Sequence, residues 1–396
     1  MSMNEQMEES EASILHTYNR FPVVFEKGEG CYLYDSEGKK YLDFAAGIAV
    51  NALGYHYPGY DEALKSQIDK LMHISNLYYN EPIIDAGAKL VQVSHMEKAF
   101  FTNSGTEAIE GALKAAKKYA YLKDGCTDHE IIAMNHSFHG RSIGALSVTG
   151  TAHYRDPFEP LMGGVKFADF NDLESVKAQI TDKTCAIITE TVQGEGGIYP
   201  ATKEFLEGLR KLCDEKDLIL ILDEIQCGMG RTGHYFAWQA YGVQPDIMTS
   251  AKALGCGVPV GAFVLNEKAA KASLEPGDHG TTYGGNPFVC AAVSKVFDIY
   301  ENDKIIEHVQ EMTPYLEQKL DEIVAKHECA ATRRGMGFMQ GIVIQGRPVG
   351  EVVKAALAKG LLVISAGSDV LRIVPPLVIT KEHIDKMAAI LDECME

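Results

Sequence analysis

The 396-residue sequence lacks any apolar run near the length of about 20 residues that spans a bilayer. It also lacks a basic start followed by an apolar stretch, so residues 1–12, which are acidic, are expected to be a frayed, solvated segment and not a secretory signal. Positive charge is scarce, because 37 Lys and Arg against 55 Asp and Glu give a net charge of −18. Such a surface repels polyanions, so nucleic acid and anionic membranes are not expected as partners.

The nine cysteines include no CxxC pair and no spacing typical of a metal site. An odd, dispersed set suits reduced thiols, so we expect a cytoplasmic protein that uses no structural metal. Cys227 and Cys256 lie near the candidate site described below, and a small buried thiol is the expected role of each.

Internal repeats and low-complexity linkers are absent too, and the length predicts about two or three domains. Between residues 98 and 265, short apolar runs alternate with amphipathic stretches. This pattern predicts an α/β fold with a mostly parallel sheet, helices on both faces, and binding loops at the carboxyl ends of the strands. The predicted strands are 99–102, 131–134, 185–189, 218–222, 247–250 and 261–265, and the predicted helices include 106–122 and 203–216.

The last hundred residues have a different pattern. A helical stretch at 287–301 and helical patterns over 305–329 precede short strands at 338–344, 361–365 and 371–374, which predicts a smaller α+β domain. Residues 31–43 read as a hairpin with a turn at Ser36-Glu37-Gly38, and we expect them to join this domain. The predicted organisation is therefore an N-terminal segment (1–50) contributing to the small domain, a large domain (51–295) and a C-terminal small domain (296–396).

A lysine and an aspartate follow two neighbouring predicted strands. Lys252 stands where strand 247–250 meets a glycine-rich turn, and Asp223 directly follows strand 218–222. Pyridoxal phosphate (PLP) chemistry requires this pair, because a lysine amine forms a Schiff base with the cofactor aldehyde and a carboxylate keeps the pyridine nitrogen protonated. Alone, the lysine also fits a solvated loop, and the aspartate also fits a magnesium site, a ribose site or a helix cap.

Other strand ends carry further candidates. Gly105 and Thr106 follow the first strand at a predicted helix start, whose free N–H groups suit a phosphate, although a capping box of Ser104 with Glu107 explains the same residues. After the second strand, Phe138 is placed to stack on a flat ring and Arg141 to grip a carboxylate. A core phenylalanine and a surface ion pair are the alternatives.

Two glycine-rich loops complete the set. Strand 185–189 leads into Glu190 and the acidic loop 193–197, which contains Glu195. Residues 280–287 carry the hydroxyls of Thr281 and Thr282, which suit a phosphate but also suit ordinary turns. Together the strand ends supply a phosphate cradle, a stacking ring, a carboxylate and a lysine amine.

These residues, with the segments 32–35, 47–54, 75–80, 223–226, 251–255 and 372–377, resemble the fold-type I, class III (subgroup II) PLP aminotransferases over nearly the full chain. Within that class the sequence is similar to acetylornithine and ornithine aminotransferases. The resemblance implies PLP as cofactor, a fold-type I PLP-transferase with large and small domains, and a homodimer with shared active sites.

The resemblance also implies residue roles. Lys252 is expected to be the Schiff-base lysine and Asp223 the partner of the pyridine nitrogen, and Thr282 is expected to reach the phosphate of the neighbouring subunit's cofactor. The implied cofactor-binding set is Gly105, Thr106, Phe138, Asp223, Gln226, Lys252 and Thr282. The implied substrate-binding set is Tyr18, Arg141, Glu195, Thr281 and Arg372, with Glu195 masking Arg372 between half-reactions.

The expected reaction transfers the terminal amino group of N2-acetylornithine to 2-oxoglutarate, in arginine biosynthesis, giving N-acetylglutamate 5-semialdehyde and glutamate. Ornithine-specific relatives share a tyrosine at the position of Ile48, so this residue argues against plain ornithine as the donor. Succinylornithine, ornithine and 4-aminobutyrate nevertheless stay open as donors. A PLP-dependent racemase or aminomutase and a non-catalytic binding protein are the other hypotheses. Thr191, Tyr55 and Cys256 depart from the family pattern, and none of the three removes a catalytic role.

Overall fold

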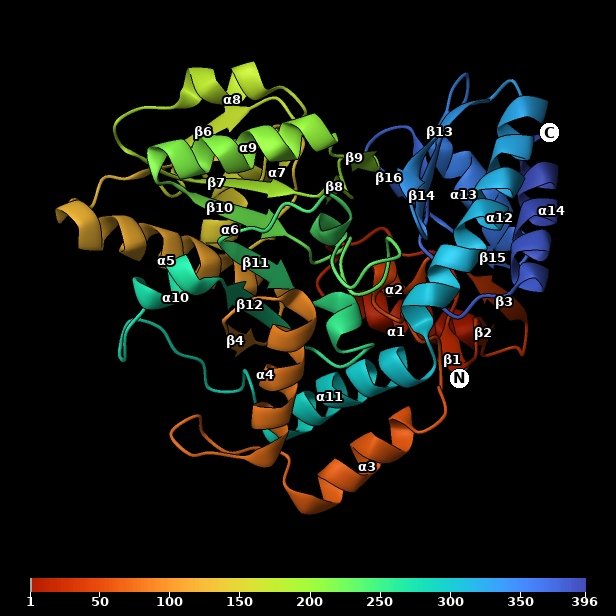
Figure 1. The fold of residues 1–396 in the computed structure, drawn as a ribbon. Coiled ribbons are helices and arrows are strands. Elements are labelled where there is room, and N and C mark those ends of the chain that lie inside the picture. The colour runs from red at the N-terminus through yellow and green to blue at the C-terminus, as the bar shows by residue number, and fades with distance from the viewer. Residues whose placement is uncertain (1) are drawn as a thin grey trace.

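The computed structural model describes residues 2–396. Its largest sheet has seven strands in the order β4-β12-β11-β10-β7-β5-β6, with helices on both faces (Figure 1). All strands run parallel except β12, which is antiparallel to both its neighbours. The strands are β4 (Lys98–Thr102), β5 (Glu130–Met134), β6 (Val165–Ala168), β7 (Thr184–Glu190), β10 (Ile219–Asp223), β11 (Ile247–Ser250) and β12 (Gly261–Leu265). The six predicted strands and the mostly parallel α/β fold are confirmed, and β6 was missed.

Alternation along the strands explains how the sheet is covered. In β10, Leu220 and Leu222 belong to one hydrophobic cluster, whereas Ile219 and Ile221 belong to another, because successive side chains point to opposite faces. Helix α9 (Lys203–Lys216) contributes to the first cluster and α5 (Gly105–Asp124) to the second. These two predicted helices are confirmed, and they place the amino end of α5 beside the carboxyl ends of the strands.

The C-terminal part contains α11 (Pro287–Asn302), α12 (Ile305–Lys326), α13 (Val349–Ala358) and α14 (Lys381–Met395). Its sheet has the order β13-β14-β17-β16. The strands are β13 (Ala330–Met336), β14 (Met339–Ile344), β16 (Ile364–Ala366) and β17 (Val370–Ile373). The sequence missed β13, whose side chains are mostly half-buried or exposed and lack a clean apolar pattern.

A further sheet joins the two ends of the chain. The predicted hairpin forms β2 (Tyr32–Asp35) and β3 (Lys40–Asp43), which extend with β1 (Phe25–Glu29) and β15 (Leu361–Leu362) into a sheet of order β1-β2-β3-β15. Because β3 pairs in parallel with β15, the N-terminal hairpin lies against the C-terminal part. The domain boundaries themselves stay a prediction.

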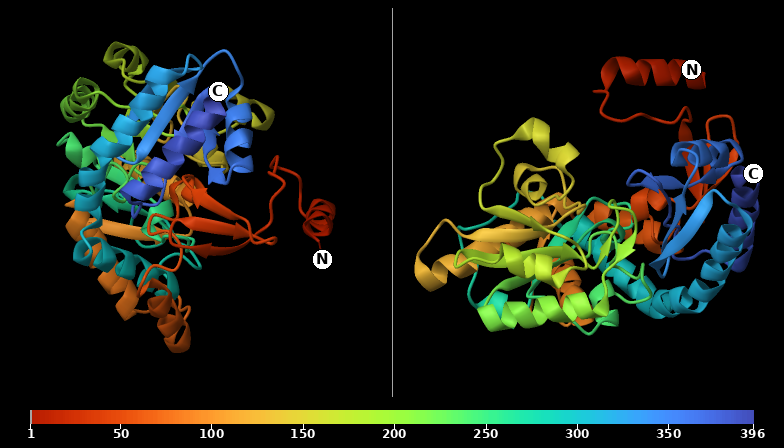
Figure 2. Two further views of the ribbon diagram at one scale, coloured as in Figure 1. Left: turned by 90° about the vertical axis from the view of Figure 1, so that its right-hand side faces the viewer. Right: turned by 90° about the horizontal axis from the view of Figure 1, so that it is seen from above.

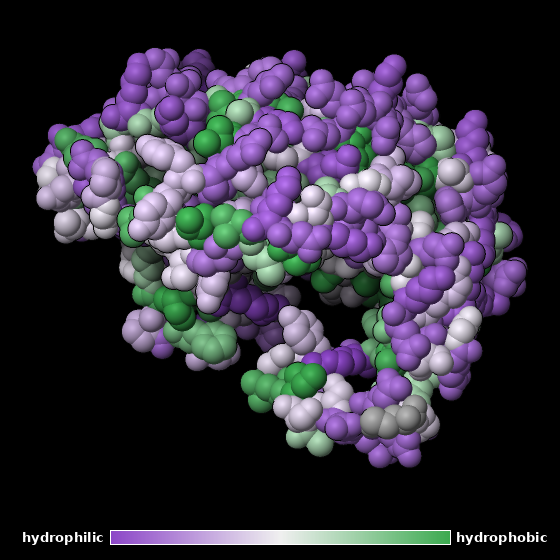
Figure 3. Space-filling model, turned by 90° about the horizontal axis from the view of Figure 1, so that it is seen from below, coloured by the Kyte–Doolittle hydropathy of each residue, from purple (hydrophilic) through white to green (hydrophobic). Residues whose placement is uncertain are grey.

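The N-terminal segment differs from expectation. Residues 2–12 were predicted to be frayed, but helix α1 (Met3–Ser13) forms, because Ser2 and Glu5 make a reciprocal capping box. Met1 lies outside the described residues. None of the residues of α1 is buried, and the helix projects from the body (Figure 2). Seen from below, an opening separates this arm from the rest of the molecule (Figure 3).

The remaining elements connect these sheets. They are α2 (Ala46–Ala49), α3 (Tyr60–Lys70), α4 (Glu81–Ser94), α6 (Ile143–Ser147), α7 (Ala152–Arg155), α8 (Leu173–Gln179), α10 (Glu267–Lys271), the short strands β8 (Val192–Gln193) and β9 (Tyr199–Pro200), and three 3₁₀ turns at Asp156–Phe158, Ala237–Ala240 and Lys252–Leu254. Among residues 2–396, no helix is long and apolar enough to cross a membrane.

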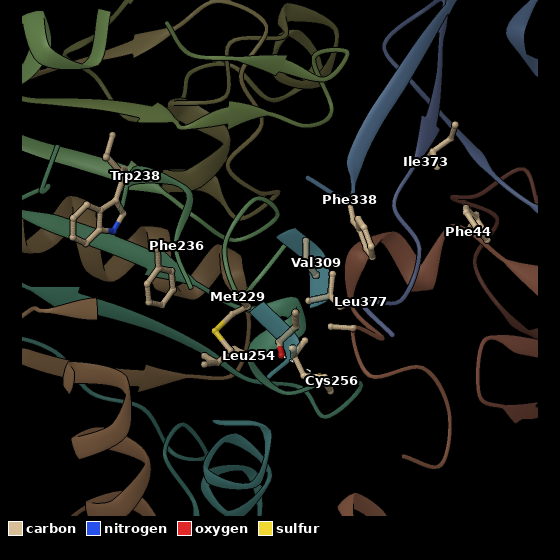
Figure 4. Close-up of a cluster of buried hydrophobic side chains, with 14 of the residues drawn as sticks. Phe44, Met229, Phe236, Trp238, Leu254, Cys256, Val309, Phe338, Ile373 and Leu377 are labelled. Atoms are coloured by element: carbon tan, nitrogen blue, oxygen red, sulfur yellow. Dashed lines mark hydrogen bonds between the residues drawn. The ribbon is translucent and has the colours of Figure 1, made fainter. Parts of the chain in front are cut away.

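One buried cluster continues from the large sheet into the C-terminal part. Phe236 and Trp238, beyond β10, belong to the same cluster as Met229, and this cluster extends to Phe338 and Leu377 (Figure 4). The core therefore ties the region of the predicted site to β17 and the residues that follow it.

Candidate active site

The carboxyl ends of β10 and β11 open into a cavity of about 480 Å³. In parallel sheets ligands bind at this edge. Eight of the residues predicted from the sequence line it: Gly105, Thr106, Phe138, Arg141, Glu195, Asp223, Gln226 and Lys252.

Asp223 is fixed by three donors. Its Oδ2 lies 2.7 Å from His139 Nδ1, and its Oδ1 accepts from the Ile225 backbone N–H at 2.9 Å and from Thr249 Oγ1 at 3.2 Å. The carboxylate is 3% exposed. His139 was missed as a site residue, although it belongs to the segment 135–141 that follows a strand. Its Nε2 is buried without a hydrogen-bond partner among residues 2–396.

Lys252 carries a free amine into the cavity. Its Nζ forms no hydrogen bond and no ion pair with the described part of the chain, and its backbone has φ of +50°. Burial lowers the pKa of this amine to about 8, and the positive charge of Arg372 also acts to lower it. The carboxylates of Glu195, Asp223 and Glu190 act to raise the same pKa. Near pH 8 a large fraction of the amine is therefore neutral and nucleophilic.

The amino end of α5 borders the cavity. Ser104 caps the helix by accepting from the Glu107 backbone N–H at 3.4 Å. The predicted capping box is only half formed, because the Glu107 carboxylate accepts from the Asn103 backbone N–H at 2.6 Å and not from Ser104. A Cβ at Gly105 would lie 2.9 Å from the Ile225 side chain, so glycine keeps this approach open. A helix amino end lined by Gly105 and Thr106 is suited to a phosphate.

Glu195 and Arg372 form a bidentate pair. Arg372 Nη1 donates to Glu195 Oε1 at 2.5 Å and Nη2 donates to Oε2 at 3.2 Å, and Nη1 also donates to Gln226 Oε1 at 3.1 Å. Arg372 is 3% exposed. Burial acts to raise the pKa of Glu195, but the charge and hydrogen bonds of Arg372 outweigh it and lower that pKa. The carboxylate thus neutralises an arginine that burial would otherwise leave costly.

Arg141 differs from Arg372 in being free. Its guanidinium lies 4.5 Å from the ring centre of Tyr154 and 5.5 Å from that of Phe138, and it forms no ion pair within residues 2–396. The cavity therefore has one available guanidinium in its lining, and Glu195 of the same lining masks a second one, each suited to a carboxylate.

A second residue that the sequence did not single out for the site is Glu190. Its two carboxyl oxygens accept from the backbone N–H groups of Phe138 at 3.3 Å and Gly194 at 3.2 Å, so it ties the half-buried aromatic ring to the loop that carries Glu195. Glu190 pairs in register with Asp223 on the neighbouring strand. Burial and the charge of Asp223 raise the pKa of Glu190 well above its usual value.

Four predicted residues do not line the cavity, and one of them, Arg372, adjoins it through its hydrogen bonds to Glu195. Thr281 is linked to it through Asn103, whose Nδ2 donates to Thr281 Oγ1 at 3.3 Å. Thr282 is exposed on the following turn. Tyr18 is 69% exposed on the N-terminal arm and lines a different cavity. Their roles stay predictions.

The three departures from the family pattern have structural roles. Thr191 Oγ1 donates to Glu224 Oε1 at 2.6 Å, and burial raises the pKa of Glu224 to about 7. Tyr55 donates its hydroxyl to Asp43 at 2.8 Å, and Cys256 is a buried thiol as expected.

Residues 14–395 match the family model described as aminotransferase class-III. The chain belongs to the class-III aminotransferases. An acetylornithine aminotransferase from Caldanaerobacter subterraneus subsp. tengcongensis is 47% identical to it over 96% of this chain and 97% of that protein. One from Methanocaldococcus jannaschii is 48% identical over 96% of this chain and 95% of that protein. An ornithine aminotransferase structure from Toxoplasma gondii, with partial occupancy of PLP at its active site, has a TM-score of 0.95 at 28% identity and covers 100% of this chain and 94% of that one.

This aminotransferase is thus a PLP-dependent enzyme, and the residues of the cavity fit the cofactor. The amino end of α5 offers N–H groups that suit the phosphate. The Asp223 carboxylate, which accepts three hydrogen bonds, suits the pyridine nitrogen, and the unpaired Lys252 amine suits the aldehyde. The predicted cofactor, enzyme class and fold type are confirmed.

Proposed function

We propose that this aminotransferase moves the terminal amino group of N2-acetylornithine to 2-oxoglutarate, giving N-acetylglutamate 5-semialdehyde and glutamate. The observation that carries the proposal is a free Arg141 in the cavity together with an Arg372 that Glu195 of the same cavity masks. Two carboxylate sites, one of them switchable, suit an enzyme that takes two unlike substrates in turn. The acetylornithine aminotransferases that resemble the chain over nearly its full length support this donor.

The roles that the resemblance implies for the cofactor-side residues are part of the proposal. Bound PLP supplies a ring that accepts the electrons released at the substrate carbon. Gly105 and Thr106 would hold the phosphate, Phe138 would stack on the ring, Gln226 would lie near the ring hydroxyl, and Asp223 would keep the pyridine nitrogen protonated. Lys252 Nζ would hold the aldehyde end, and its free amine would move the proton at the reacting carbon.

The substrate-side residues divide the two half-reactions. Acetylornithine brings its terminal amine to the cofactor and its distant carboxylate to Arg141, while Glu195 neutralises Arg372. 2-Oxoglutarate carries a carboxylate beside its keto group, which requires Glu195 to release Arg372, and its far carboxylate takes Arg141. Thr281 and Tyr18 complete the substrate pocket when the arm and the dimer are in place.

A homodimer with shared sites is part of the proposal. Thr282 precedes Tyr283, whose side chain is 62% exposed. The turn that carries both residues is joined to the segment around Asn76, because Asn76 Nδ2 donates to the Gly284 carbonyl at 2.8 Å. The adjoining segment presents Leu77 and Tyr79, which are 87% and 96% exposed. Contiguous exposed apolar side chains mark an interaction surface. A second copy seated there brings Thr282 to the partner's cofactor phosphate.

We also propose that the enzyme lies in the cytoplasm and acts in arginine biosynthesis. Its proposed domains are an N-terminal segment (1–50) that contributes to the small domain, a large domain (51–295) and a C-terminal small domain (296–396). The pairing of β3 with β15 supports a discontinuous small domain.

A donor panel tests the proposed reaction. The holoenzyme is assayed with acetylornithine, succinylornithine, ornithine and 4-aminobutyrate, each with 2-oxoglutarate, and kcat/KM is compared. Acetylornithine is expected to give the highest value, and each productive donor is expected to bleach the yellow colour of the enzyme. A higher value for another donor reassigns the substrate, and turnover without any keto acid favours a racemase or aminomutase.

A further inference from the structure

A second, larger cavity lies on the other side of Arg372. We call it the outer chamber. Its volume is about 1130 Å³, and it is lined by residues 19–23 of the N-terminal arm, by Lys39 and Ile48, by the face of α13 that carries Lys354, and by Ile364 and Ser365 beside Arg372. Arg372 lines the outer chamber, whereas its partner Glu195 lines the inner cavity of Lys252. The ion pair is therefore the partition between the two spaces.

The charge of the outer chamber is opposite to that of the chain. Its lining contains four basic residues, Arg20, Lys39, Lys354 and Arg372, and no Asp or Glu within residues 2–396. The whole chain carries a net charge of −18, so a cavity wall of only positive charges is a local exception.

The four basic residues differ in their ion-pair and hydrogen-bond partners. Arg20 is paired with Glu11 at 3.2 Å, and Lys39 donates to the Ala358 carbonyl at the end of α13 at 2.9 Å without a carboxylate partner. Lys354 is exposed and forms no ion pair with any described residue. Arg372, although buried, keeps its Nε without a hydrogen-bond partner in the described chain. Lys39, Lys354 and Arg372 Nε thus leave donor capacity that a carboxylate ligand can take up.

We propose that the outer chamber is an access and holding site for dicarboxylate substrates, in which Lys354 and Lys39 select the anionic acceptor before it reaches Arg372. The inference rests on the proposed function, since it concerns how the acceptor enters the same site. 2-Oxoglutarate carries two negative charges and glutamate a net single one. Acetylornithine carries one carboxylate and one ammonium and is neutral overall. A cationic chamber concentrates the dianion and has little effect on the neutral donor.

The ion pair between the two cavities responds to the ligand in the outer chamber. A dicarboxylate there competes with Glu195 for Arg372 and therefore favours the opening of the ion pair. The ligand then moves into the inner cavity with its carboxylate bound to Arg372. The donor has no second carboxylate for Arg372 and leaves the pair closed.

The test uses the PLP-loaded enzyme and glutarate, a dicarboxylate that lacks the keto group. Calorimetry gives the Kd of glutarate at low and at physiological ionic strength for Lys354→Gln, Lys39→Gln and the double variant. We expect the double variant to bind glutarate about three- to tenfold more weakly at low ionic strength, with a smaller salt dependence, because exposed charges act through a screened field. The ratio of kcat/KM for 2-oxoglutarate to kcat/KM for acetylornithine is expected to fall in parallel.

Lys211→Gln is the matched control, because Lys211 is an exposed lysine on α9 with its side chain 78% accessible. Unchanged glutarate affinity and salt dependence in the double variant overturn the proposal, as does an equal fall of kcat/KM for both substrates. Glutarate binding does not depend on the identity of the donor. If the enzyme rejects acetylornithine while the double variant still binds glutarate more weakly, the donor assignment fails and the outer chamber stands.

Discussion

Replacement of Asp223 by asparagine changes one atom of the carboxylate that, in the proposed function, contacts the pyridine nitrogen. The backbone N–H of Ile225 points at Oδ1, so the amide oxygen of asparagine must take that position and its Nδ2 must take the place of Oδ2. There it faces His139 Nδ1, which now bonds to Oδ2 at 2.7 Å. An acceptor with a full charge becomes a neutral donor.

The loss of one charge-assisted hydrogen bond is worth about 1.5–3 kcal/mol, so we expect the half-reaction with acetylornithine to slow about 10- to 150-fold. Single-turnover absorbance of the loaded enzyme measures that rate. Asp246→Asn is the control, because Asp246 is also buried, at the opposite end of the same strands, where it accepts from the Leu220 backbone N–H at 2.8 Å. That variant is expected to unfold more easily in urea while keeping the wild-type rate. An unchanged rate in Asp223→Asn refutes the assignment of this carboxylate, and equal slowing in both variants assigns the effect to the fold.

Four further predictions concern the same cavity. Lys252→Ala is expected to bind PLP without a covalent link, as mass spectrometry after borohydride reduction can show, and to have no turnover; wild-type turnover would exclude Lys252 as the proton carrier. Since burial lowers the pKa of Lys252 to about 8, its amine is protonated below that pH and neutral above it, so covalent capture of PLP by the apoprotein should accelerate with pH about a midpoint near 8, and a midpoint near the ordinary lysine value contradicts this. Glu195→Gln should leave Arg372 available and raise the ratio of the glutamate half-reaction to the acetylornithine half-reaction; an unaltered ratio removes the switch but not the aminotransferase. Mixing Lys252→Ala with Thr282→Ala subunits should restore activity through hybrid dimers with one intact site, and activity no higher than either parent, despite subunit exchange, favours sites built from one chain.

The parts of the fold that the sequence predicts are those where burial is complete. The strands β10, β11 and β12 are buried along their whole length, and their apolar runs leave little alternative. β6 lies at the edge of the sheet and is mostly half-buried, and β13 mixes exposed and half-buried residues, so neither has a distinctive pattern. The pairing of β3 with β15 joins residues about three hundred positions apart, which no local pattern encodes.

In the candidate site, too, the sequence predicts some residues and misses others. The rule that ligands bind at the carboxyl ends of parallel strands was enough to single out Lys252 and Asp223. The roles of His139 and Glu190 depend on side-chain direction, because each matters through bonds to residues on another element. The helix α1 was missed because its capping box involves ordinary polar residues that also suit a solvated segment.

The left-handed backbone at Lys252, with φ of +50°, bears on protein engineering. A residue other than glycine held in this region costs about 1–3 kcal/mol, and asparagine or glycine tolerates it better than lysine. Selection for heat resistance alone would therefore tend to reward replacement of a side chain on which the proposed chemistry depends. A thermostable descendant obtained without an activity screen can be inactive for this reason, and position 252 should be held constant in any such library.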